Sequence, residues 1–345
     1  MQSKSQDISQ SSGLQQKRIN LQSAPQIEHL RQLTAKLKEN LALCAAPKDH
    51  EPTVDAVHDV RTGTRRIEAI LDSMQASTQS SSNGRSTQAE SAHAALSDAI
   101  GRWQRLLRKI RRSAGAIRDL DVHRHLLRDL LKSRSKDETP SGSAVSEDLQ
   151  APPVQTPLQK QADDLDAWLK HSRREHSQPL VAGARKWAEK LDAHLAAMTE
   201  VLQAQPPRRG KPASAAVTAL EAFARLSSEM QQLYADNLHD FRKGAKKARY
   251  MAETGGSDEH AGAVGKALKK LQDEIGDWHD WLVLAEEAHS ALGDQGVELT
   301  ARIEHEREAH YASAMKTAER MRGRLMGEWR ASATKTRRVT HPPRL

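Results

Sequence analysis

Apolar residues recur every three or four positions through most of the chain, and polar or charged residues fill the positions between them. In the segment 53–76, the stripe expected to be buried consists of Val57, Val60, Thr64, Ile67, Leu71 and Met74. This spacing is typical of an amphipathic α-helix, and no segment alternates convincingly over the length of a strand. The sequence therefore predicts an all-α protein, with helices near residues 27–45, 53–76, 90–113, 116–133, 158–176, 180–204, 214–231, 234–254, 260–275, 278–293 and 296–328.

Segments rich in Ser, Pro or charge interrupt this pattern and divide the chain into two parts. Residues 26–204 and 214–328 each contain enough amphipathic helices for a bundle, and they are predicted to be two helical repeats. The segments predicted to lie outside the bundles are a disordered tail (1–25), disordered loops near 77–90 and 133–157, a linker (205–213) and a basic C-terminal tail (329–345).

One helical motif occurs twice, as VHDVRTGTRR at residues 57–66 and as LHDFRKGAKK at residues 238–247. His, Asp, Arg, Gly and a basic pair stand at identical offsets in both copies. A second pair follows, with GAIRDLDV starting at Gly115 and GDWHDWLV starting at Gly276. Such self-similarity predicts an internal duplication, and two bundles related by a pseudo-two-fold axis are the expected assembly.

The repeated motifs carry positive charge along one edge of each predicted helix. His58, Arg61 and Arg65 follow the spacing of the apolar stripe displaced by one residue, so they line its flank. Gly63 and Gly244 occupy equivalent positions despite the poor helix propensity of glycine, which indicates close approach of another helix. The candidate anion-binding residues are His58, Arg61, Arg65, Arg66, Arg105, Arg108, Lys109, Arg112, Arg118, His239, Arg242, Lys243, Lys246, Lys247, Arg249, Lys266, Lys269 and Lys270.

Composition narrows the class of partner. The 345-residue chain has a formal net charge of +8, which favours a polyanion, whereas only 3% of its residues are aromatic. This scarcity argues against a base-stacking surface for single-stranded nucleic acid. The single cysteine, Cys44, excludes an intrachain disulfide and is in phase with a leucine stripe, which predicts a core position. No apolar run is long enough to cross a membrane, so a soluble cytoplasmic protein is expected.

Patterns for catalysis and metal binding are weak. Asp55 with His58, and Asp236 with His239, stand one helical turn apart, but each pair offers only two ligands beside repelling cations. His305 and His310 lack the spacing of two zinc ligands on one helix face. There is also no glycine-rich phosphate loop and no nucleophile elbow. The sequence therefore predicts no metal, no cofactor and no enzyme activity.

With these motifs in place, the chain resembles the CHAD family, the conserved histidine α-helical domain, over roughly residues 27–328. The resemblance rests on the two His-x-x-Arg motifs and on the run RDLDV that starts at Arg118. It implies two helical bundles with pseudo-two-fold symmetry that bind inorganic polyphosphate through basic residues, in some members at polyphosphate granules. His279 departs from the family pattern, which often has Asn there. The β-tunnel domain to which some members are fused is not expected here.

The sequence thus predicts a non-catalytic polyphosphate-binding protein whose two basic stripes converge. Arginines such as Arg61 and Arg242 would form forked hydrogen bonds to phosphate oxygens, and lysines would act as point charges. Asp119 and Asp280 would position neighbouring cations. Two alternatives remain open at this point: a nucleic-acid-binding protein, and an enzyme that processes phosphoanhydrides with the help of Mg²⁺.

Overall fold

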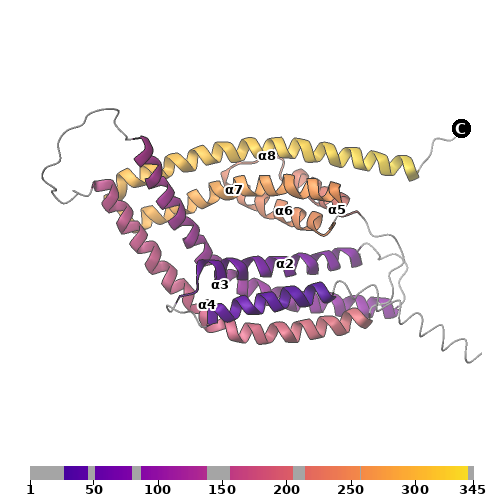
Figure 1. The fold of residues 1–345 in the computed structure, drawn as a ribbon. Helices are drawn as coiled ribbons and strands as arrows, with labels where there is room; N and C mark the ends of the chain where they lie inside the picture. Colours follow the sequence, from indigo (N-terminus) through magenta and orange to yellow (C-terminus); the bar gives the residue numbers. More distant parts are fainter. Residues whose placement is uncertain are drawn as a thin grey trace, which may run out of the picture. The chain divides into compact units, whose positions relative to one another are not determined.

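The computed structural model describes residues 27–45, 51–79, 87–137, 156–204, 214–256 and 258–340, and these residues form helices without any strand (Figure 1). The all-α prediction is confirmed. A helix covers residues 27–45. It is followed by α2 (Val54–Gln79), α3 (Thr87–Asp137), α4 (Pro157–Ala204), α5 (Ala215–Glu229), α6 (Ala235–Glu253), α7 (Glu259–Leu292), a 3₁₀ turn (Gly293–Gly296) and α8 (Val297–Thr340).

Three predicted helix breaks are wrong, because α3, α4 and α7 each continue through them. The expected turns lay around Gly115, before Leu180, and around Gly276. A glycine inside a helix costs about 1 kcal/mol and a proline about 3 kcal/mol. Packing offsets these local costs, since Ala114 and Ile117 on either side of Gly115 are fully buried, as is Leu180 beside Pro179.

The last helix is longer than predicted. α8 continues to Thr340, so most of the expected C-terminal tail is helical, and Trp329 packs against the core of its unit. The predicted tail at 1–25 and linker at 205–213 lie outside the described residues, as do the central parts of the two predicted loops.

Two compact units divide the chain, and neither is a continuous segment. Unit 1 consists of residues 1–118 and 176–212, and unit 2 consists of residues 119–175 and 213–345. The middle of the predicted first repeat therefore packs with unit 2, so the units do not coincide with the predicted repeats. Two of the wrongly predicted breaks, near Gly115 and Pro179, fall close to where α3 and α4 pass from one unit to the other.

The core of unit 1 is built from the helix of residues 27–45, α2, and the parts of α3 and α4 that belong to this unit. Leu37, Leu41, Ile67 and Trp103 are fully buried in it. Cys44 is also fully buried, which confirms its predicted core position, and burial raises the pKa of its thiol to about 11.

Unit 2 has two apolar clusters. One joins α5, α6, α7 and α8 around Phe223, Phe241 and Trp278. The other joins α3, α4, α7 and α8 and includes buried Leu165 and Ile303. Close to this second cluster lie charged groups in the buried pair Arg173–Asp121, whose Nε and Oδ1 atoms are 2.6 Å apart, and in the His123–Glu287 contact of 2.7 Å.

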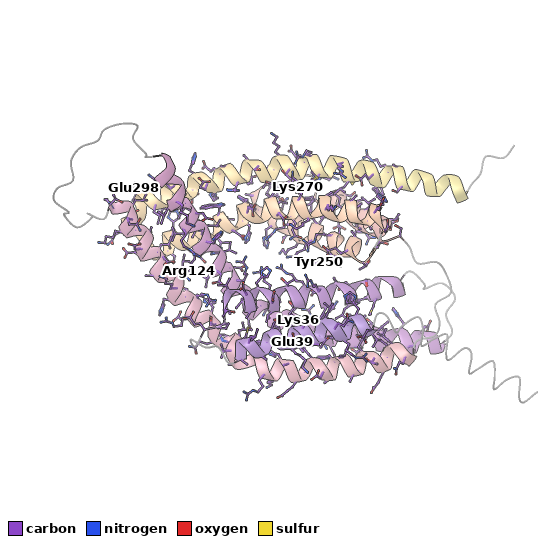
Figure 2. The ribbon with its side chains drawn as sticks, viewed as in Figure 1. Lys36, Glu39, Arg124, Tyr250, Lys270 and Glu298 are labelled. Atoms are coloured by element: carbon purple, nitrogen blue, oxygen red, sulfur yellow. The ribbon has the colours of Figure 1, made fainter. Side chains whose placement is uncertain are left out.

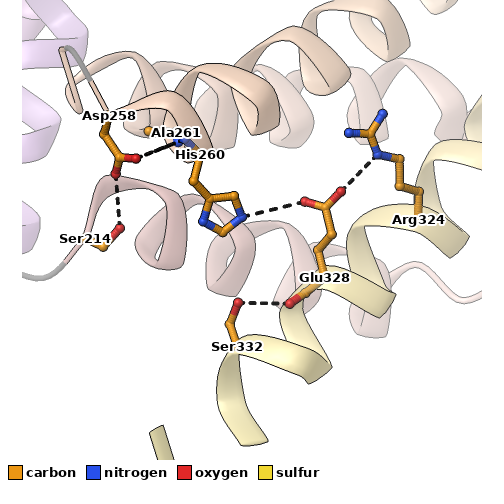
Figure 3. Close-up of polar contacts among 7 residues, drawn as sticks. All are labelled: Ser214, Asp258, His260, Ala261, Arg324, Glu328 and Ser332. Carbon is orange, nitrogen blue, oxygen red and sulfur yellow. Dashed lines mark hydrogen bonds and ion pairs between the residues drawn. The ribbon is translucent and has the colours of Figure 1, made fainter. Parts of the chain in front are cut away.

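The start of α7 is fixed to its neighbours by polar contacts (Figure 3). Asp258 caps the helix by accepting from the backbone N–H groups of His260 and Ala261, at 3.0 and 3.3 Å. Glu328 of α8 accepts from Arg324 Nε at 2.9 Å and lies 3.9 Å from His260 Nε2. The contact between His260 and Glu328 connects the start of α7 to the C-terminal part of α8 within unit 2.

Close helix approach at the two motif glycines is confirmed. A Cβ atom at Gly244 would lie 2.5 Å from a methyl carbon of Leu226 in α5, and one at Gly63 would lie 3.3 Å from a methyl carbon of Leu37. In each unit, the motif helix therefore uses its glycine to pack against the preceding helix.

Candidate anion-binding surfaces

In unit 1, the basic flank of α2 lies along α3, at the edge of the core. Arg61 Nη1 donates to the carbonyl oxygen of Gly115 at 3.4 Å, and Gln104 Nε2 donates to Asp72 Oδ1 at 2.6 Å. Residue numbers fall along α3 as they rise along α2, so the helices run antiparallel. We call this contact line the α2–α3 seam. It joins the two motifs that the sequence identified as repeated.

In unit 2, α6 and α7 meet in a corresponding way. Arg242 occupies the position of Arg61, and its Nε donates to the carbonyl oxygen of Gln272 at 3.1 Å. One turn away, the rings of His239 and His279 stack with centroids 4.1 Å apart. We call this contact line the α6–α7 seam. In both units, the motif arginine is thus anchored to the backbone of the adjacent helix.

The two motif histidines have different surroundings. His58 is exposed, and its Nε2 lies 3.4 Å from the hydroxyl of Thr62. His239 is half-buried, and its Nδ1 has no hydrogen-bond partner within the described part of the chain. Burial, followed by repulsion from His279, Lys243 and Arg242, lowers the pKa of His239 to about 4. The ring of His239 is therefore neutral at pH 6 to 8 in the unliganded protein.

Several candidate cations are already paired with carboxylates. Lys243 Nζ lies 2.5 Å from Asp240 Oδ1, and Lys269 pairs with Asp273. Arg249 is only 14% exposed, lies 3.1 Å from Glu253 and stacks on the ring of Tyr250. The exposed lysine pairs are weak and can exchange partners, whereas Arg249 is held inside its own unit.

Other candidates have no carboxylate partner among the described residues. Among them, Arg242 is half-buried and contacts α7 at the α6–α7 seam. Arg65 and Lys246 do not belong to this group; they are half-buried and continue the flanks of α2 and α6. The candidates without a described carboxylate partner are Arg66, Arg105, Arg108, Lys109, Arg112, Arg118, Arg242, Lys247, Lys266 and Lys270.

Not all candidates belong to the seams. Arg105, Lys109 and Arg112 are exposed and lie about half a helical turn from buried Trp103, so they point away from the core of α3. Lys266 and Lys270 are exposed on α7, and Lys270 is labelled in Figure 2. Arg66 and Lys247 follow the motif glycines by three residues, which places them on the opposite edge of α2 and α6 from the seams. The structure thus divides the candidate set into seam cations and outer cations.

Sequence reasoning assigned no role to His279 and His194. His279 stands one turn after Gly276 in the repeated motif, and this spacing on the same helix face was an available signal. His194 of α4 stacks on Trp103, and burial, together with Arg102, Lys190 and Arg105, lowers its pKa. The cations around His194 come from α3 and α4, which are distant in sequence, so no local sequence pattern indicated this environment.

The described residues contain no group of three or more His, Cys, Asp or Glu side chains suited to hold a metal ion. Within the same residues, no helix has the length and apolar character needed to span a bilayer.

Comparison with known proteins identifies the family. No curated protein matches the chain. A crystal structure of the CHAD domain from the plant Ricinus communis matches with a TM-score of 0.50 and 20% identity, over 86% of this chain and 88% of that one. The family model described as the CHAD domain matches residues 84–289, which include both glycine-led motifs and the second His-x-x-Arg motif. The chain therefore belongs to the CHAD domain family.

Proposed function

We propose that this protein binds inorganic polyphosphate without catalysing its conversion, through the basic seams of its two units. The observation that carries the proposal is the state of Arg242. Its guanidinium is half-buried, is anchored through Nε to a backbone carbonyl, and pairs with no carboxylate of the described residues. A partly desolvated cation without a counter-charge favours an anion that can accept forked hydrogen bonds.

The neighbouring residues fit a chain of phosphates better than a single one. Lys243 and Lys246 follow Arg242 on α6, and Arg65 follows Arg61 on α2, so charges are spaced along each helix edge. The pair between Lys243 and Asp240 is exposed and therefore weak, so a polyanion can compete for the lysine. That the two flanks converge on one polyphosphate chain, and that the repeats arose by duplication, are further parts of this proposal.

The test removes two charges from one seam at a time. Arg61→Ala with Arg65→Ala, and separately Arg242→Ala with Lys246→Ala, should each weaken binding of long-chain polyphosphate at least tenfold. A hydrogen bond to a charged group contributes about 1.5–3 kcal/mol, and 1.4 kcal/mol corresponds to a factor of ten. Affinity is measured by fluorescence anisotropy at one salt concentration, with helicity and Tm as checks on folding.

A matched control separates a defined site from overall charge. Lys186→Ala with Lys316→Ala also removes two charges, from exposed positions on α4 and α8 outside the seams. This variant should bind within about twofold of the wild-type chain. Equal losses in the control and the seam variants would refute the seam as the binding site. An effect from only one seam variant would instead refute a two-sided site.

Two measurements distinguish polyphosphate binding from the alternatives, a nucleic-acid-binding protein and an enzyme that processes phosphoanhydrides. Duplex DNA should compete poorly with polyphosphate at equal phosphate concentration, and stronger binding of DNA would favour a nucleic-acid-binding protein. Incubation with polyphosphate and Mg²⁺ should release no phosphate above a protein-free control. Cytoplasmic location and association with polyphosphate granules follow from the same proposal.

A further inference from the structure

Gly276 occupies the middle of α7, where a glycine is unfavourable for the helix. The reason lies in the neighbouring arginine. A Cβ atom at position 276 would lie 2.4 Å from Nη2, 3.0 Å from Cζ and 3.2 Å from Nε of Arg242. Since these are the three nearest heavy atoms, the guanidinium of Arg242 fills the space that any other side chain at 276 would enter.

Arg242 is held against α7 at two points. Its Nε donates to the carbonyl oxygen of Gln272 at 3.1 Å, and its terminal atoms lie over Gly276, one turn further along α7. Next to it, the stacked rings of His239 and His279 connect the same two helices. The pose of this guanidinium is therefore set by the backbone of α7, and its remaining N–H groups are available to an anion.

We infer that Gly276 is a positioning residue: the lack of a side chain there lets Arg242 lie flat on α7 with its forked donors directed at a bound phosphoryl group. This inference rests on the proposed function and assigns to one glycine the geometry of the α6–α7 seam. A preorganised guanidinium loses less conformational entropy on binding than a mobile one, so its placement contributes directly to affinity.

Unit 1 lacks this constraint. Gly115, at the equivalent position, would have no heavy atom within 4 Å of an added Cβ, although its carbonyl oxygen accepts from Arg61 at 3.4 Å. The α2–α3 seam therefore holds its arginine less closely. The two seams are expected to differ in their dependence on glycine.

The experiment compares Gly276→Ala with Gly262→Ala, a control in the same helix where an added Cβ meets nothing within 4 Å. Both changes replace glycine by the best helix former, so Tm should not fall in the control. Only Gly276→Ala should weaken long-chain polyphosphate binding, by about tenfold. Because the glycine acts through the arginine, Gly276→Ala combined with Arg242→Ala should bind no more weakly than Arg242→Ala alone.

A second readout does not depend on polyphosphate. The Nε–H NMR signal of Arg242 should be protected from exchange in the wild-type chain and in Gly262→Ala, and unprotected in Gly276→Ala. If Gly276→Ala folds poorly, the double variant must recover its stability, because removal of the arginine head clears the space for the methyl group. Unchanged affinity, additive losses in the double variant, or an unchanged signal would each overturn the inference. Failure of the wild-type chain to bind polyphosphate would refute the proposed function instead.

Discussion

The half-buried histidine of the α6–α7 seam should make unit 2 less stable in mild acid. Burial and the neighbouring groups His279, Lys243 and Arg242 lower the pKa of His239 from an ordinary 6.5 to about 4. In the unfolded chain the imidazole takes up a proton as pH falls through 6.5, whereas in the folded protein it stays neutral until about pH 4. Because the unfolded chain binds one more proton than the folded protein in this range, the free energy of unfolding is unaffected by His239 above pH 6.5 and falls between pH 6.5 and 4.

The structure sets the size of this effect. One pKa unit corresponds to 1.36 kcal/mol, so a fall from 6.5 to about 4 gives an upper bound of about 3 kcal/mol. His239 is only half-buried, and solvent screening reduces this to on the order of 1–2 kcal/mol. For a unit of this size, 1 kcal/mol changes Tm by about 2–4 °C, so a shift of several degrees is expected.

The assay compares the wild-type chain with His239→Gln by calorimetry at pH 7 and pH 4.5. Glutamine does not titrate, so the variant should lose several degrees less in Tm between the two pH values. Carboxylates titrate in both proteins and cancel in the difference. NMR of the imidazole ring gives the pKa directly. Identical losses of Tm in both proteins, or titration of the His239 ring near pH 6.5, would refute the reasoning.

Three further predictions concern salt and packing. Polyphosphate affinity should fall by about 10³–10⁵ between 50 and 200 mM salt if six to ten phosphates are neutralised, and titrations that show little change would contradict a multi-cation site. Gly244→Ala should lower the free energy of unfolding in urea by about 1 kcal/mol, because its methyl would lie 2.5 Å from Leu226 and overpacking outweighs the gain in helix propensity. Gly262→Ala, whose methyl meets nothing within 4 Å, should not lower the free energy of unfolding. Asp121→Asn should cost about 3–5 kcal/mol in the same assay by removing the carboxylate charge that pairs with buried Arg173, and a loss below 1 kcal/mol would show that water already screens the pair.

The sequence by itself determined the helices and the positions of their basic flanks. Both follow from periodicity, because residues three and four apart share one face of a helix whatever surrounds it. For the same reason, the core position of Cys44 and the close helix contacts of Gly63 and Gly244 could be predicted. Equivalent spacing in the two motifs also placed Arg61 and Arg242 on corresponding helix flanks, and each donates to a backbone carbonyl of the adjacent helix, although Gly115 and Gln272 are not equivalent positions.

Only the tertiary structure decided where the helices end, which unit each segment joins and which cations lie at a seam. Gly115, Pro179 and Gly276 disfavour a helix locally, but burial of their neighbours outweighs that cost, and burial depends on residues distant in sequence. The pKa of His239 was likewise hidden, because it depends on desolvation by packing and on a ring from another helix. Local spacing fixes which face a side chain occupies, whereas its neighbours, solvent exposure and charge state arise from contacts that only the folded chain brings together.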